Sequence, residues 1–378
     1  MPSERYEIRV PVKRLLIGLL LTIVPICLAG LWTISQSERA LVNTIGTHFR
    51  TIAEGTATEI AAYIHERVVN VSVMANEPTV VDAVTAANLA YQGMSEAAIA
   101  GRIQRIENEW NTPAAEATVR GMLTSRASRT LLHHRELDPR FLRVTITDAR
   151  GATVAATHKT LDYFQADEDF WQAIYAKGRG TVNLTDILYD EVTKSNYIGI
   201  GVPIVEEGTQ RFVGAVDALV DVTSLFPFVN RVQLGPTSRA ALVKEDGTII
   251  AAPGVVFSMN LKSDIYATVK DALQTLHGRQ TGYMVADVSG GARKLIGFAD
   301  TGLKADYRNL GWVVLVSQDS LEAFAPVRTV SRFLAFMALV GLAVVVFLGV
   351  YFSLHRRPEM TDIEGALKRP QPAERKTA

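Results

Sequence analysis

The sequence predicts an α+β protein with a long N-terminal helix followed by two antiparallel-sheet modules, between two transmembrane helices. Three observations predict this fold. Two uncharged apolar runs lie near the ends of the chain, a helical apolar stripe follows the first run, and a strand–turn–strand pattern occurs twice between the runs. The segment between the runs is therefore expected to hold most of the folded core.

The two apolar runs, residues 15–34 and 333–354, are each long enough to cross a bilayer as a helix. Lipid offers no hydrogen bonds, so both are expected to be helical, and Pro25 is tolerated within the first. The alternative for the first run is a cleaved signal peptide, although its length and Trp32 near its end favour a span. The alternative for the second run is a buried core helix.

Basic residues lie on the terminal side of each run. Before the first run and after the second they are Arg5, Arg9, Lys13, Arg14, His355, Arg356 and Arg357. Because basic flanks stay in the cytoplasm, we expect residues 1–14 there as an N-terminal segment and residues 355–378 as a short disordered tail. Residues 36–332 are then expected on the outer side of a membrane whose lipid surrounds both spans.

Residues 35–77 are expected to form one long helix, because apolar or small residues recur there every three or four positions. These residues are Leu41, Ile45, Phe49, Ile52, Thr56, Ile60, Ile64, Val68 and Val71. No proline interrupts the segment, and Pro78 ends it. The stripe either pairs with a second chain in a homodimer that carries a signal, or packs against the chain's own domain.

The rest of the outer segment changes from helical to strand patterns. Residues 80–135 are alanine-rich and helical in pattern, and hairpins follow at FLRVTITDARGATVAAT (141–157) and SRAALVKEDGTIIAAP (238–253). Further strands are expected at residues 180–184, 197–205, 212–222, 280–288, 294–299 and 312–317. Further helices are expected at residues 167–177, 265–276 and 321–330.

This order of elements resembles the double Cache (dCache or PDC) sensor domain of bacterial chemoreceptors and sensor kinases. The resemblance covers residues 36–332 and rests on the two hairpins together with DEDFWQAI, GIGVPIVEEGTQRFVGAVDALVDV and NLGWVVLVSQDSLEAFAPV. It implies that both antiparallel-sheet modules are PAS-like, with a ligand-binding distal module at about residues 80–235 and a proximal module at about residues 236–325. It also implies a bacterial inner membrane with the domain in the periplasm or outside the cell.

The resemblance also implies a ligand pocket in the distal module. Trp171 matches the family's tryptophan by its DFW context, Tyr189 and Asp190 lie near a tyrosine–aspartate position, and Asp217 lies near the last aspartate position. Amino-acid-binding members carry an arginine two residues before the tryptophan, where this chain has Asp169. Without that arginine an α-amino acid is disfavoured.

A cationic or amine ligand fits the residues better, because carboxylates and aromatic faces attract ammonium groups. We expect Asp169, Asp190 and Asp217 to bind it together with aromatic side chains. Those aromatic residues are Tyr163, Trp171 and Tyr197. Core packing is the alternative for the aromatic residues, and an ordinary turn is the alternative for Tyr189 and Asp190. Asp217 is the sharpest candidate, since an unpaired carboxylate in an apolar strand is costly.

The bulk composition excludes several other functions. The chain has 39 basic and 39 acidic residues, so no basic surplus indicates nucleic acid. Its one cysteine, Cys27, permits no zinc site built from cysteine pairs. The sequence contains no catalytic motif, so we expect no enzyme, no metal and no cofactor.

The predicted function is therefore an extracytoplasmic small-molecule sensor. The segment after residue 354 is short and carries no kinase or cyclase motif, so the sensor is expected to act through a separate membrane or cytoplasmic signalling partner. The alternative is a membrane-anchored solute-binding or scaffold protein without signalling.

Overall fold

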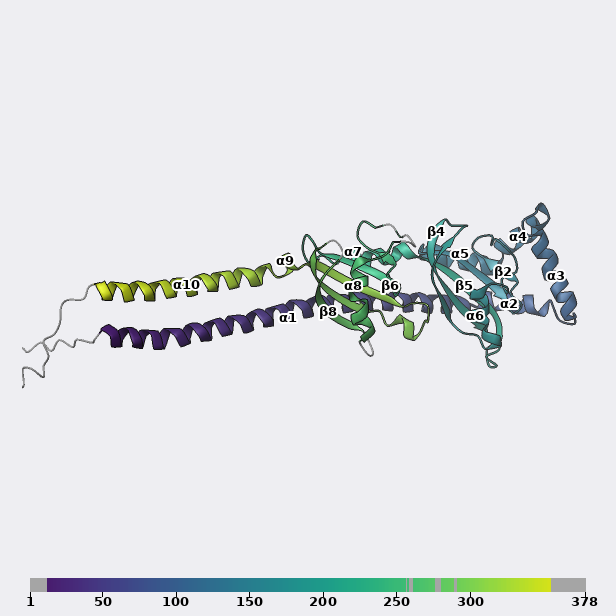
Figure 1. Cartoon of the computed structure of the whole chain (residues 1–378). Coiled ribbons are helices and arrows are strands. Elements are labelled where there is room, and N and C mark those ends of the chain that lie inside the picture. Colours follow the sequence, from purple (N-terminus) through teal and green to yellow (C-terminus); the bar gives the residue numbers. More distant parts are fainter. Residues whose placement is uncertain (1–11, 256, 258–260, 276–279, 289–290, 355–378) are drawn as a thin grey trace, which may run out of the picture. The chain divides into compact units, whose positions relative to one another are not determined.

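The computed structural model describes residues 12–255, 257, 261–275, 280–288 and 291–354 (Figure 1). The chain divides into two compact units, one formed by Thr44–Ala323 and the other by the segments that flank it. The first unit holds two antiparallel sheets and most of the helices, which confirms the predicted α+β class with a long helix before the sheets. Residues 1–11 and the predicted tail at 355–378 lie outside the described residues.

The predicted long helix is α1 (Val12–Ala75), and Pro25 lies inside it. Pro78 then occupies the first turn of α2 (Pro78–Leu89), where proline's missing N–H costs nothing. Between Thr44 and Ala75, one side of α1 is buried. The buried stripe includes Phe49, Thr56, Ile60, Ile64, Val68 and Val71. In this part of α1 the stripe therefore packs against the chain's own domain.

The helical region at 80–135 is divided into several helices because it contains internal capping residues. Ser95 and Ser125 each accept a hydrogen bond from a backbone N–H as N-caps, and Pro113 begins a single 3₁₀ turn. After α2 the helices are α3 (Glu96–Glu109), α4 (Glu116–Leu123) and α5 (Arg126–Leu137).

The first sheet has five strands in the order β2-β1-β5-β4-β3, all antiparallel. They are β1 (Phe141–Asp148), β2 (Thr153–Ala156), β3 (Asn183–Asp190), β4 (Ser195–Val205) and β5 (Phe212–Asp221). Different helices cover its two faces: Val84 of α2 lies beside Gly214, and Ile174 of α6 (Asp169–Tyr175) lies beside Gly201. A short helix, α7 (Phe226–Asn230), follows the sheet.

The second sheet repeats this topology in the order β7-β6-β10-β9-β8. Its strands are β6 (Arg239–Lys244), β7 (Ile249–Ala251), β8 (Thr281–Asp287), β9 (Arg293–Asp300) and β10 (Trp312–Asp319). Helix α8 (Asp264–Thr275) packs its apolar side, including Tyr266, Val269 and Leu273, into this sheet's core. The central strand β10 leads along the chain into α9 (Ser320–Ala323) and α10 (Ala325–Leu354).

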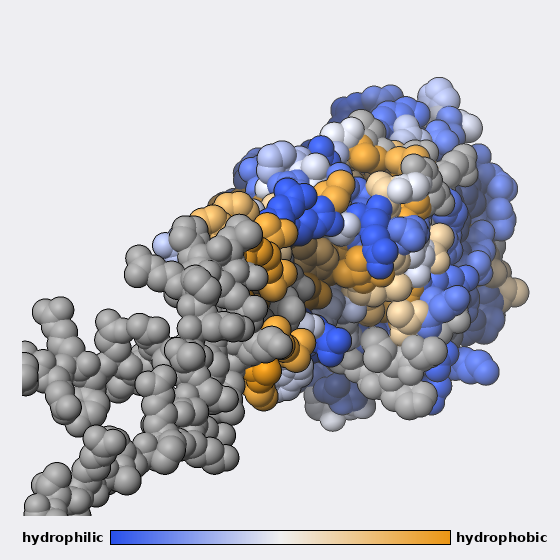
Figure 2. Space-filling model, turned by 60° about the vertical axis from the view of Figure 1, so that its left-hand side comes forward, coloured by the Kyte–Doolittle hydropathy of each residue, from blue (hydrophilic) through white to orange (hydrophobic). Residues whose placement is uncertain are grey.

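Among the described residues, one helical segment is long and apolar enough to cross a membrane by length and composition. It is Ala325–Tyr351, with a mean hydropathy of 2.8 and none of its apolar window buried. The exposed apolar side chains of α10 include Phe336 and Leu339. Figure 2 shows orange hydrophobic residues on the surface of the molecule among blue hydrophilic ones. The first predicted span lies within α1, and the two-pass arrangement stays a prediction.

Gly297 of β9 provides a test of how α1 packs on the second sheet. A Cβ at this position would lie 2.5 Å from the backbone carbon and oxygen of Phe49 in α1. We expect Gly297→Ala to lower the free energy of unfolding by about 1–3 kcal/mol, because the helix must move away from the strand. Thermal unfolding followed by circular dichroism measures this.

The control is Gly101→Ala on the exposed side of α3, where a Cβ meets nothing within 4 Å. Replacing a glycine in a helix interior by alanine stabilises by roughly 0.5–1 kcal/mol, so this variant is expected to melt higher. Equal melting temperatures for the two variants would contradict the close approach of α1 to β9.

Candidate functional site

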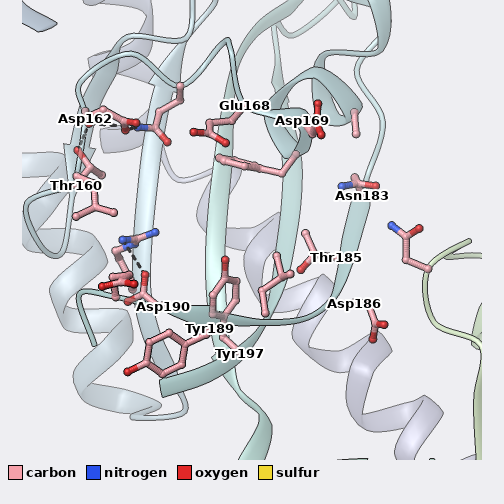
Figure 3. Close-up of a pocket in the computed structure, with 18 residues that line it drawn as sticks. Thr160, Asp162, Glu168, Asp169, Asn183, Thr185, Asp186, Tyr189, Asp190 and Tyr197 are labelled. Atoms are coloured by element: carbon pink, nitrogen blue, oxygen red, sulfur yellow. Dashed lines mark hydrogen bonds and ion pairs between the residues drawn. The ribbon is translucent and has the colours of Figure 1, made fainter. Parts of the chain in front are cut away.

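A pocket of about 450 Å³ lies beside the first sheet on the face covered by α6 (Figure 3). Its walls come from β1, β3, β4, α6 and the segment 160–169, and Asn309 contributes from the loop before β10. The polar residues around it are Arg143, Thr160, Asp162, Gln165, Glu168, Asp169, Asn183, Thr185, Asp186, Tyr189, Asp190, Glu191, Tyr197 and Asn309. Its size suits a small organic molecule.

The pocket lining is strongly acidic. Its acidic residues are Asp162, Glu168, Asp169, Asp186, Asp190 and Glu191, whereas Arg143 is its only basic residue among the described lining residues. Burial, followed by repulsion from Asp162 and neighbouring acids, raises the pKa of Glu168. Burial likewise raises the pKa of Asp162, and nearby Glu107 adds to the effect. A cation in the pocket would relieve this repulsion.

Asp190 and Arg143 form a buried ion pair at one end of the pocket. The Arg143 Nη1 lies 3.1 Å from Asp190 Oδ1. The second carboxylate oxygen accepts hydrogen bonds from the Thr193 backbone N–H at 2.8 Å and from its hydroxyl at 2.7 Å. Asp190 thus fixes the turn between β3 and β4, and its oxygens already have partners.

Asp217 lies on β5, directly opposite Thr145 of β1 and Gly201 of β4. Directly opposed residues in antiparallel strands point to the same face, so Asp217 shares the face of Arg143 and Tyr197, which line the pocket. Its half-buried carboxylate makes no hydrogen bond or ion pair within the described part of the chain. Burial raises its pKa to about 6, with Arg143 opposing the rise and Asp190 adding to it.

Two further polar groups on this face lack partners among the described residues. They are the Thr145 hydroxyl and the Arg143 Nε, both buried. A buried polar group without a hydrogen bond costs about 1–3 kcal/mol, so natural structures usually satisfy it. A donor group on a bound molecule would satisfy the Asp217 carboxylate and the Thr145 hydroxyl, whereas the Arg143 Nε–H needs an acceptor.

The structure brings together four of the residues that the sequence singled out. Asp169, Tyr189, Asp190 and Tyr197 all line the pocket. Burial raises the pKa of Tyr197 to about 12, and the nearby Asp217 contributes. In Figure 3, Asp169 lies across the pocket from Asp190 and the two tyrosines.

Trp171 and Tyr163 do not line this pocket. The indole N–H of Trp171 donates to the Thr147 hydroxyl at 2.9 Å, and its ring stacks on Tyr175 with centroids 5.1 Å apart. The ring of Tyr163 packs on Trp110 with centroids 5.2 Å apart. Both aromatic residues therefore pack in small cores beside the sheet.

Sequence reasoning did not single out Arg143 or most of the polar residues of β3. Those β3 residues are Asn183, Thr185 and Asp186. Asn183 and Thr185 alternate with buried Leu184. Had the predicted strand been continued beyond residue 184, this alternation would have placed both polar side chains on one face of the sheet. Asp186 follows a register shift between Leu184 and Ile187, where the alternation no longer predicts a face.

The comparisons with known proteins cover about three quarters of the chain. A family model described as a Cache domain (dCache_1) matches residues 37–327. A search of curated proteins finds no match.

Solved structures similar to this chain include three chemoreceptor domains. The ligand-binding domain of Pseudomonas fluorescens CtaA, in complex with L-isoleucine, is 17% identical over 76% of this chain and 98% of its own, with a TM-score of 0.46. The sensory domain of Campylobacter jejuni Tlp3 with isoleucine is 12% identical over 75% and 96%, with a TM-score of 0.48. The ligand-binding domain of Pseudomonas aeruginosa PctB with L-Gln is 17% identical over 76% and 97%, with a TM-score of 0.45.

Proposed function

This chain belongs to the Cache domain family, and from that membership we propose that it is an extracytoplasmic sensor that binds a small cationic or amine ligand beside its first sheet. The acidic pocket lining, with Asp217 unpartnered next to it among the described residues, carries this proposal. An ammonium group would gain from the carboxylates, and the faces of Tyr189 and Tyr197 would add cation–π attraction. Arg143 is already paired with Asp190, which disfavours its use for a ligand carboxylate.

The proposal includes a membrane topology. In it, α10 and the start of α1 cross the inner membrane of a bacterium, both termini are cytoplasmic, and the signal passes to a separate signalling protein. The exposed apolar surface of α10 supports a membrane crossing by that helix. Crosslinking in membranes, followed by purification, tests whether a signalling protein accompanies the chain. If no signalling protein is crosslinked to the chain, with or without ligand, the solute-binding or scaffold alternative is favoured.

A homodimer through α1 is also part of the proposal. Val69 and Val73 are exposed on α1 opposite its buried stripe and one helical turn apart, which gives a second copy of the helix an apolar line to pack against. Cysteine crosslinking at Val73 in the full chain tests this arrangement, because a parallel pair of helices places the two copies of that residue close together.

The ligand class is tested by calorimetric titration of the full chain in lipid nanodiscs. The panel holds choline, 1,4-diaminobutane and spermidine, with L-glutamate and acetate as anionic controls. We expect heat from at least one cation and none from the anions. At 100 times its dissociation constant such a ligand should stabilise the fold by about 2.7 kcal/mol. Heat from the acidic compounds alone would overturn the proposal.

Binding of the cation is expected to strengthen as pH rises from 5 to 7. The pKa of Asp217 is raised to about 6, so its carboxylate is mostly protonated at pH 5 and mostly ionised at pH 7. If only the ionised form attracts the ammonium group, the dissociation constant should fall by about tenfold across this range. The panel's amines stay charged throughout, so their own titration does not contribute. Binding that weakens as pH rises would contradict the role of Asp217.

A further inference from the structure

Strand β3 contacts both the pocket and the second sheet. Asp186 and Asn309 line the pocket, Asp186 from β3 and Asn309 from the loop before β10. The Asn309 side-chain amide donates to the Leu184 carbonyl oxygen at 2.8 Å. The Asp186 Oδ2 lies 2.8 Å from the Nζ of Lys244, the last residue of β6. The wall of the pocket is therefore bonded directly to the second sheet.

The carboxylate of Asp186 is fixed by its place in the strand. The register shift between Leu184 and Ile187 turns the side chain out of the regular alternation. The Ile187 backbone N–H donates to Asp186 Oδ1 at 2.8 Å, which leaves Oδ2 to Lys244. The side chain is still 38% exposed, and Figure 3 shows it at the edge of the pocket. A bound molecule can therefore reach it.

Lys244 is more deeply buried than Asp186. Its side chain is 15% exposed, and its Nζ lies 6.0 Å from the ring centroid of Phe257. Asp186 is the one acidic partner that the described residues supply to it. Lys244 is also paired in register with Trp312, the first residue of β10, which leads along the chain into α9 and α10. A change at Lys244 therefore acts on the strand pair that precedes the last helix.

We propose that Asp186 is a counter-ion shared between the pocket and Lys244, so that a cationic ligand competes with Lys244 and ligand occupancy is transmitted to the second sheet. This inference rests on the proposed function, since it needs a positively charged ligand. Two cations near one carboxylate repel each other, so the ligand weakens the ion pair between the sheets. Asp190 is less suited to this role, because its side chain is only 5% exposed, against 38% for Asp186, and its partners Arg143 and Thr193 do not belong to the second sheet.

Such competition has a reciprocal consequence that binding measurements detect. If the ligand weakens the Asp186–Lys244 pair, removing the charge of Lys244 must strengthen ligand binding by the same coupling. We expect Lys244→Met to lower the dissociation constant of the tightest-binding panel cation by about tenfold, within the usual range of such couplings. Methionine keeps the length of the buried stem and removes the charge.

The matched control is Lys294→Met. Lys294 pairs with Asp319 at 2.7 Å, and the two side chains are 21% and 38% exposed, much like the Lys244–Asp186 pair. It belongs to the same sheet, but neither Lys294 nor Asp319 lines the pocket. This variant loses the same charge, and we expect it to leave the dissociation constant unchanged within about twofold.

A second variant completes a double-mutant cycle. Asp186→Asn should weaken cation binding, and adding Lys244→Met to it should then have no further effect. Unchanged or weaker binding by Lys244→Met alone, with normal binding by the wild type, would overturn the shared counter-ion. A wild type that binds none of the panel's cations would instead overturn the proposed function, so the two failures are distinguishable.

Discussion

Replacing Asp217 by asparagine is expected to abolish binding of a cationic ligand and, at the same time, to stabilise the folded protein at neutral pH. The pKa of Asp217 is raised from 3.8 to about 6 by burial. Between these values the folded state keeps a proton that the unfolded state has released, so stability falls as pH rises through this range. Above pH 6 the full cost applies, about 3 kcal/mol for a shift of this size.

Asparagine cannot ionise, so Asp217→Asn avoids this cost. Thermal unfolding should show a higher melting temperature than wild type at pH 7 and nearly the same one at pH 4, where Asp217 is protonated. Ligand affinity should fall by about 100-fold or more, because one partner of a desolvated charge pair is lost. A carboxylate that costs stability in the free protein and gains a partner in the complex is consistent with a binding role.

The control is Asp221→Asn on the same strand. The Asp221 Oδ1 accepts a hydrogen bond from the Thr223 backbone N–H at 2.8 Å, and asparagine keeps this acceptor, so the control should melt close to wild type rather than above it. Ligand affinity should be retained, because the Asp221 carboxylate already bonds the turn after β5, whereas that of Asp217 has no partner among the described residues. If Asp217→Asn lowered the melting temperature at pH 7, or bound the cation normally, Asp217 would be a structural residue.

The fold was largely predictable because its turns carry local signals. Gly151 and Gly247 adopt positive φ angles of 82° and 84° in the two hairpins, a conformation that glycine reaches without strain. The apolar stripe of the long helix predicted its buried side between Thr44 and Ala75. The far end of β3 was not predictable, since Asp186 lies at a register shift that the two-residue alternation cannot anticipate.

The candidate site was harder to predict, because its residues are joined by contacts between distant segments. Trp171 lies on a short helix, and its sequence context is compatible both with a ring that lines the pocket and with a buried ring. The structure shows the buried ring, with the indole N–H bonded to the Thr147 hydroxyl. Arg143 lies on a strand where a charged residue usually indicates a solvent-facing position. Only the pairing with Asp190, on another strand of the sheet, places it at the pocket. Such pairings follow from topology, which local patterns do not specify.

Asp138→Ala is expected to cause the largest loss of stability, about 3–5 kcal/mol. Arg67 of α1 is only 1% exposed and forms ion pairs with Asp138 and with the exposed Glu66. Its guanidinium also lies 5.1 Å from the ring centroid of Tyr63, and its Nε has no partner among the described residues. Without the Asp138 carboxylate, the buried guanidinium of Arg67 keeps only the exposed carboxylate of Glu66 as an ion-pair partner.

The pKa of Asp138 reports the same interaction. Burial alone would raise it, but hydrogen bonds from Arg140 and attraction to Arg67 outweigh burial and hold the pKa below 3.8. A carboxyl group of this kind contributes stability above its unfolded pKa that is lost as pH falls through the lower, folded value. The melting temperature of Asp138→Ala should therefore differ most from wild type at neutral pH, and the difference should shrink in acid.

Two comparisons separate an uncompensated charge from a general loss of packing. Glu116→Ala removes the carboxylate of an exposed pair with Arg120, 2.6 Å apart, and should cost less than about 1 kcal/mol. Adding Arg67→Met to Asp138→Ala removes the stranded charge and keeps an apolar stem of similar length. The double variant should therefore melt above Asp138→Ala alone, since replacing a buried ion pair by apolar residues is often neutral. A double variant that melts lower would show that Arg67 stabilises α1 through its packing on Tyr63, whatever its charge.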